Sequence, residues 1–119
     1  MSQGYHSEST ERLAMSEDEL LLQLGTDLAG TQALPLLPGE LVDRARRWLA
    51  AQREYLEAQV CSSESIRQFT LATADNSAIA VELAKLLAGL LLPVNPVTLA
   101  VLLVKKGLKT FCATIWESK

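Results

Sequence analysis

Aromatic side chains, histidine and cysteine are all scarce in this chain of 119 residues. Phe, Trp and Tyr occur twice each, and His6 is the one histidine. A structural zinc site needs about four nitrogen or sulfur ligands in a closed geometry, which His6 and two distant cysteines do not supply. A cysteine–histidine catalytic pair needs a third group to hold the histidine, and the polar segment around His6 offers none. We therefore expect no catalytic residues and no metal site.

Glycine-rich phosphate loops are also missing, since Gly89 and Gly107 stand alone within helical patterns. No cofactor and no small-molecule substrate is evident. We expect the protein not to be an enzyme, because no acid–base set can be named.

Two cysteines, Cys61 and Cys112, are too few for a disulfide framework. The sequence shows no secretory signal and no lipidation motif, so we expect a cytoplasmic protein with reduced thiols. Cys112, between Phe111 and Ala113, is predicted to be a small buried hydrophobe. Cys61, at the end of a predicted helix, is predicted to be more exposed, which makes it the candidate for any thiol chemistry.

Strong positive charge is absent: the net charge is −3, with an acidic first half and a mildly basic second half. Arg44, Arg46, Arg47 and Arg53 cluster on one predicted helix. That helix also carries several carboxylates, and nucleic-acid-binding domains are usually basic as a whole. We expect no nucleic-acid partner and interpret these arginines as a solvated face or as anchors for a protein contact.

The longest uncharged run, residues 86–104, has the length of a membrane-spanning helix, but Pro93, Asn95 and Pro96 interrupt it. Proline within a helix removes a hydrogen bond and clashes with the preceding turn. The same residues suit a turn, because Asn95 is a good N-cap and Pro96 is tolerated at the first helical position. The sequence favours a buried helical hairpin, joined at 93–95, over a single spanning helix.

The remaining pattern is helical throughout, because leucine and alanine dominate and no run alternates like a strand. We predict an all-α, compact four- or five-helix bundle with a C-terminal hydrophobic hairpin. Residues 1–15 are expected to form a flexible tail and 16–119 a single helical domain. Predicted helices cover 17–29, 39–60, 63–74, 77–92 and 96–116, with a linker over 31–39 that packs across the bundle and with Gly107 bending or dividing the last helix.

A capping box formed by Ser16 and Glu19 is expected to start the first of these helices. The predicted core comprises Trp48, Leu49, Leu56, Phe69, Leu83, Leu87, Leu99, Leu102 and Phe111.

The helix predicted over 77–92 is apolar on nearly all sides, so a partner chain is expected to cover part of it. This predicts a non-catalytic protein–protein interaction or regulatory (adaptor) module that self-associates or joins a larger complex. Glu82 and Lys85 are either a surface ion pair or a polar device that fixes register in an interface. The alternative is a small membrane-active protein that inserts the 78–116 hairpin. The candidate interface residues are Arg44, Arg47, Trp48, Tyr55, Glu82, Lys85, Leu86 and Leu90.

Overall fold

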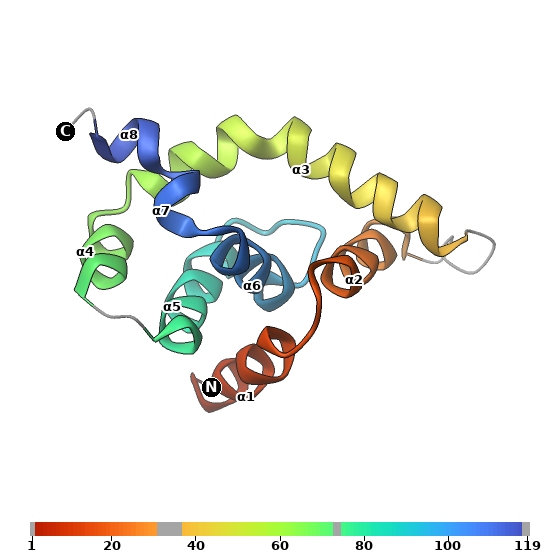
Figure 1. The fold of residues 1–119 in the computed structure, drawn as a ribbon, viewed down its shortest axis with the longest axis horizontal. Coiled ribbons are helices and arrows are strands. Elements are labelled where there is room, and N and C mark those ends of the chain that lie inside the picture. Colours follow the sequence, from red (N-terminus) through yellow and green to blue (C-terminus); the bar gives the residue numbers. More distant parts are fainter. Residues whose placement is uncertain (1, 31–36, 73–74, 118–119) are drawn as a thin grey trace.

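The computed structural model describes residues 2–30, 37–72 and 75–117, and every regular element in these ranges is a helix. The predicted all-α class is therefore confirmed (Figure 1). The helices are α1 (Ser2–Leu13), α2 (Glu17–Ala29), α3 (Pro38–Cys61), α4 (Glu64–Ala72), α5 (Asn76–Ala88), α6 (Pro96–Lys106), α7 (Leu108–Phe111) and α8 (Ala113–Glu117).

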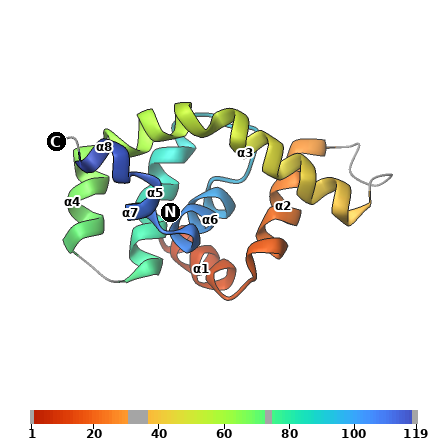
Figure 2. The same cartoon turned by 45° about the horizontal axis from the view of Figure 1, so that its top comes forward.

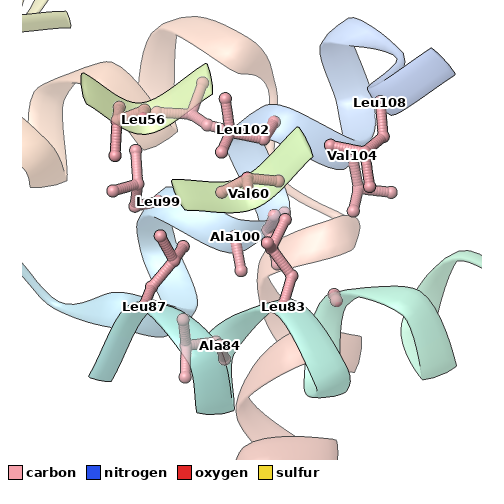
Figure 3. Packing of buried hydrophobic residues seen from close by; sticks show 14 of the residues in the cluster. Leu56, Val60, Leu83, Ala84, Leu87, Leu99, Ala100, Leu102, Val104 and Leu108 are labelled. Atoms are coloured by element: carbon pink, nitrogen blue, oxygen red, sulfur yellow. The ribbon is translucent and has the colours of Figure 1, made fainter. Parts of the chain in front are cut away.

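Helix α6 forms the centre of the molecule, and every residue from Val97 to Val104 is buried. A helix that is apolar on all sides must be enclosed on all sides. Figure 3 shows Leu56 and Val60 of α3 on one side of α6, with Leu83 and Leu87 of α5 on the other. The core is therefore built in layers around α6.

The apolar run 86–104 is divided between two helices, as the proline pattern predicted. Helix α5 ends at Ala88, four residues before the predicted end at 92, and α6 begins at Pro96 as predicted, so the connection covers 89–95 rather than 93–95. The side chain of Asn95 caps α6 by accepting from the N–H of Val97 at 2.8 Å. In Figure 3, α6 runs back along α5, from Leu99 beside Leu87 toward Val104. Within the described ranges, no helix combines the length and apolar character needed to cross a bilayer.

The first fifteen residues differ from the flexible tail expected from their polarity. Residues 2–13 form α1, which packs against α5 and α6 (Figure 1). Ser9 is fully buried, the Nε of Arg12 donates to the Oγ1 of Thr98 at 2.9 Å, and Lys105 donates to the carbonyl oxygen of Leu13. The polar contacts of this segment join residues far apart in the chain, so the local apolar pattern does not predict them.

Two predicted helix boundaries are confirmed in detail. The Ser16–Glu19 capping box is present, with hydrogen bonds of 3.0 and 3.1 Å in its two directions. Gly107 separates α6 from α7 and has φ = 98°, a conformation that L side chains rarely adopt. Residues 31–36 of the predicted linker and 73–74 of the predicted third helix lie outside the described residues, and Leu37 at the end of that linker is exposed.

The predicted core is confirmed for five of its six leucines: Leu56, Leu83, Leu87, Leu99 and Leu102 are buried. Trp48, Leu49 and Phe111 are only half-buried, and Phe69 is 36% exposed. These four side chains lie on helices at the surface of the bundle, so each has one face in contact with water.

Candidate functional site

An apolar depression between α2, α3, α6 and α7 has a volume of about 280 Å³ and three cationic side chains at its edge. We call it the basic-rimmed groove. Its apolar lining, which we call the floor, comprises Leu21, Leu49, Ala50, Leu56, Leu103 and Phe111, and its rim comprises Arg46, Arg53 and Lys106. Phe111 is the part of this lining that α7 contributes, and we call it the groove wall.

Four helices supply the floor. Leu21, Leu56 and Leu103 are at most 2% exposed and are fixed by the core, whereas Leu49 and Phe111 are half-buried and present apolar surface to the groove. Buried leucines in low-energy packing make this floor rigid. Figure 2 shows α3 extending over α2 at one end and lying beside α7 and α8 at the other. The groove residues come from α2, α3, α6 and α7.

The rim cations are exposed, and each has a carboxylate neighbour. Arg53 bonds to Glu57 at 2.6 Å, Arg46 approaches Asp18 at 3.3 Å, and Lys106 lies 3.8 Å from Glu17. Ion pairs at exposed positions contribute only about 0–1 kcal/mol, so an incoming carboxylate can exchange with them at little cost. Arg53 also lies 5.5 Å from the ring centroid of Phe111, within cation–π range.

Phe111 directly precedes Cys112, which is covalently bonded to α3. Cys112 forms a disulfide with Cys61 at the end of α3, and both residues are at most 1% exposed. The predicted reduced thiols and the exposed, reactive Cys61 are therefore wrong, although Cys112 is buried as predicted. The fold brings the two Cα atoms to 5.4 Å, a normal distance for a disulfide, although 51 positions separate them in the chain.

A second contact joins α8 to the end of α3, close to the disulfide. The indole Nε1–H of Trp116 donates to the carbonyl oxygen of Cys61 at 2.8 Å, and this bond is buried. Leu108, Cys112 and Trp116 recur at four-residue steps and are all buried. One face of α7 and α8 is thus anchored on α3, which leaves Phe111 at the groove.

The candidate interface residues on α3 lie beside this groove rather than in it. Arg44, Trp48 and Tyr55 share one flank of α3, and the residues at the groove, such as Leu49 and Arg53, share the other. Arg47 is exposed, Tyr55 is 43% exposed, and Arg44 and Trp48 are half-buried.

The candidate interface residues on α5 form a second group. Glu82 and Lys85 make an ion pair at 3.3 Å with both side chains more than a third exposed, which fits the surface-pair alternative. Leu86 and Leu90 are half-buried and pack against the core. Helix α1 packs against α5 and covers part of it, which the sequence did not predict, whereas Leu91, at the end of the predicted 77–92 helix, is 89% exposed.

A smaller depression of about 270 Å³ lies where α1, α2 and α6 meet, and its lining is mostly polar. Its polar groups already bond to one another: Arg12 to Thr98, and the backbone N–H of Asn95 to a carboxylate oxygen of Asp27 at 2.9 Å. These hydrogen bonds connect α1 to α6 and the α5–α6 connection to α2.

Two further depressions adjoin segments outside the described residues. One, of about 470 Å³, lies between α2 and α3 and includes Pro38, close to residues 31–36. The other, of about 510 Å³, lies between α4, α5 and α7 and includes Ala72, next to residues 73–74. The described residues that line the basic-rimmed groove are not adjacent in the chain to either of these segments.

Among the described residues, no group of three or more histidine, cysteine, aspartate or glutamate side chains is arranged to hold a metal ion. Comparison with protein-family models, with curated proteins and with solved structures gave no match. The choice of site therefore depends on the geometry of this chain alone.

Part of this site was visible in the sequence. Arg46, Leu49, Arg53 and Leu56 recur at steps of three and four residues, so they line one side of a helix. The contributions of Leu103, Lys106 and Phe111 depend on how α6 and α7 pack on α3, and no local pattern encodes that.

Proposed function

We infer that this protein is a non-catalytic interaction module that binds an apolar, acid-flanked segment of another protein in the basic-rimmed groove. The observation that carries this proposal is the combination of a rigid apolar floor with three exposed cations around it. Interface anchors are commonly aromatic or arginine side chains in well-packed pockets, and Phe111 and Arg53 meet that description.

The size of the groove favours side chains of a partner segment over a free ligand. Its volume of about 280 Å³ is just below the range of about 300–1,000 Å³ typical for pockets that enclose drug-sized molecules. It suits one or two leucine-sized anchors projecting from a longer chain. Such a segment would place the rest of its length over the surface of α3.

The charge of the rim selects the flanking residues of that segment. Arg46, Arg53 and Lys106 surround the floor, so carboxylates beside the apolar anchors would replace Asp18, Glu57 and Glu17 as their partners. Complementary charge speeds encounter and discriminates between partners more than it adds affinity. A basic segment would meet like charge at the same positions.

A selection from a random peptide display library tests this proposal without knowledge of the natural partner. The full-length oxidised protein is the bait, and peptides that also bind the Arg46→Glu/Arg53→Glu variant are removed. We expect the enriched peptides to carry leucine-like side chains with neighbouring carboxylates. Reversing the two charges should weaken such a peptide by about tenfold or more, a loss typical of charge reversal at an interface.

Arg47→Glu is the matched control, because Arg47 is exposed on the same helix but outside the groove. It changes the net charge in the same direction and should leave peptide affinity unchanged. Enrichment of basic peptides, equal loss in Arg47→Glu, or failure to enrich any peptide would contradict the proposal. Enrichment of peptides that match a segment of this chain would instead indicate self-association, which sedimentation at several protein concentrations would then establish.

A further inference from the structure

We propose that the Cys61–Cys112 disulfide controls the basic-rimmed groove, so that the groove is complete only in the oxidised protein. This inference rests on the proposed function, since it concerns the regulation of the same site. It has a structural part, the placement of the groove wall, that is measured without any ligand.

The wall that the bond controls is short. Helix α7 has four residues and α8 has five, and isolated helices of this length are not stable in water. Gly107 (φ = 98°) divides this segment from α6, so α6 does not simply continue into it. Residues 108–117 therefore depend on tertiary anchors for their position.

The anchors converge on the end of α3. They include the disulfide to Cys61, the Trp116 hydrogen bond to the carbonyl oxygen of the same Cys61, and the buried side chains of Leu108 and Trp116. Loss of the covalent bond leaves the segment held by noncovalent contacts alone. Phe111 immediately precedes Cys112, so a shift of Cys112 moves the aromatic wall of the groove and its contact with Arg53.

The redox step is thiol–disulfide exchange with a dithiol reductant. One thiolate of the dithiol attacks a sulfur of the Cys61–Cys112 bond, which breaks as a mixed disulfide forms, and the second thiolate then resolves that intermediate. The dithiol is oxidised to its disulfide, and two electrons and two protons pass to the protein, which is left with two thiols. Both cysteines are at most 1% exposed, so the reductant must wait for the segment to open.

The burial of both cysteines determines the conditions under which the disulfide can be reduced. In an oxidising environment the bond, once formed, is protected by burial and the groove stays complete. In a reducing environment the transient opening of 108–117 allows reduction, and the thiols then leave the wall loose. The binding-competent form is thus the oxidised form.

The test compares the full-length protein in its oxidised form, after reduction with dithiothreitol, and after reoxidation. Hydrogen exchange of residues 108–117 is measured together with the indole N–H resonance of Trp116, which is assigned with a Trp48→Phe variant. We expect reduction to raise exchange in this segment by about tenfold or more while α2, α5 and α6 stay protected. Affinity for a groove-selected peptide should fall by about tenfold and return on reoxidation.

Phe111→Ala in the oxidised protein distinguishes the effect of the Phe111 side chain from that of the disulfide. Peptide binding should weaken, while hydrogen exchange of residues 108–117 should stay slow. Unchanged hydrogen exchange of residues 108–117 on reduction would overturn the inference. Increased exchange in all helices would also overturn it, because the disulfide would then stabilise the whole fold rather than this segment. If the oxidised protein binds no selected peptide, the proposed function fails. Local loosening of 108–117 on reduction would then still support control of the wall by the disulfide.

Discussion

Gly25 of α2 lies directly against the backbone of Leu41 in α3. A Cβ atom at position 25 would lie 2.0 Å from the carbonyl oxygen of Leu41 and 2.6 Å from its carbonyl carbon. Real Cβ atoms essentially never approach other atoms so closely, and a backbone cannot move aside as a side chain can. The α2–α3 pair, which forms two sides of the basic-rimmed groove, therefore requires glycine at this point.

Gly25→Ala should destabilise the protein by an amount on the order of 1–3 kcal/mol, because overpacking at this contact outweighs the better helix propensity of alanine. Gly39→Ala is the control, since a Cβ there meets nothing within 4 Å. That control should be neutral or stabilising by about 0.4–1 kcal/mol. Urea unfolding of both variants measures the difference, and equal effects would show that α2 and α3 are not in this close contact.

Leu87→Ala should cost on the order of 2–5 kcal/mol, because Leu87 is 1% exposed and a cavity would form against α6. Leu91→Ala is the control in the same apolar stretch, since Leu91 is 89% exposed and should change the unfolding free energy by less than about 0.5 kcal/mol. Thermal and urea unfolding give both values. A small loss for Leu87→Ala would place this side of α5 on the surface.

Arg12→Ala should destabilise the docking of α1 by about 1–3 kcal/mol, because Thr98 is buried and loses its 2.9 Å hydrogen bond. Glu11→Ala removes an exposed neighbour on the same helix and should have little effect. Hydrogen exchange in residues 7–13 is the local readout. Slow exchange there in Arg12→Ala would mean that the apolar contacts of α1 suffice without this bond.

The capping box of α2 should make stability depend on pH in acid. The backbone N–H of Ser16 donates a hydrogen bond to the Glu19 carboxylate, and this bond is the main reason that the pKa of Glu19 lies below its ordinary value of 4.5. A hydrogen bond with the Ser16 side chain lowers that pKa further. The unfolded state therefore takes up this proton first as pH falls, so the stabilisation is present at neutral pH and is lost as pH falls through the folded pKa. Glu19→Gln should be less stable than the wild type at neutral pH, and the difference should shrink as the pH falls below the ordinary pKa of 4.5.

Urea titrations of both proteins at neutral and acid pH test this point. Ser16→Ala in the Glu19→Gln background serves as the control, because the side-chain partner is then absent at every pH. A wild-type advantage that persists unchanged into strong acid would show that the charge of Glu19 is not what the cap uses.

The features predicted best from the sequence are those that neighbouring residues determine. The start of α2 follows from Ser16 and Glu19, and the break between α5 and α6 follows from Asn95 and Pro96, which need no distant partner. The docking of α1 was not predicted because Arg12 bonds to Thr98 across 86 positions of the chain.

The same limit applies to the site. Trp48 and Tyr55, which were predicted as interface residues because they are aromatic and lie beside arginines, are on one flank of α3, whereas the depression lies on the other flank. The depression also includes Phe111, which directly precedes the disulfide-bonded Cys112. A pairing between two cysteines 51 positions apart depends on the complete fold, so neither the bond nor the groove wall has a local signature.

The most direct test of the proposed interaction site is a titration of the oxidised, methyl-labelled protein with a groove-selected peptide, followed by NMR. We expect the methyl resonances of Leu49 and Leu103 to shift progressively with peptide concentration, because both side chains line the groove. Those of Leu71 and Leu91, which are exposed elsewhere, should not move. Shifts at Leu71 or Leu91 with none at Leu49 and Leu103 would contradict the assignment of the basic-rimmed groove as the binding site.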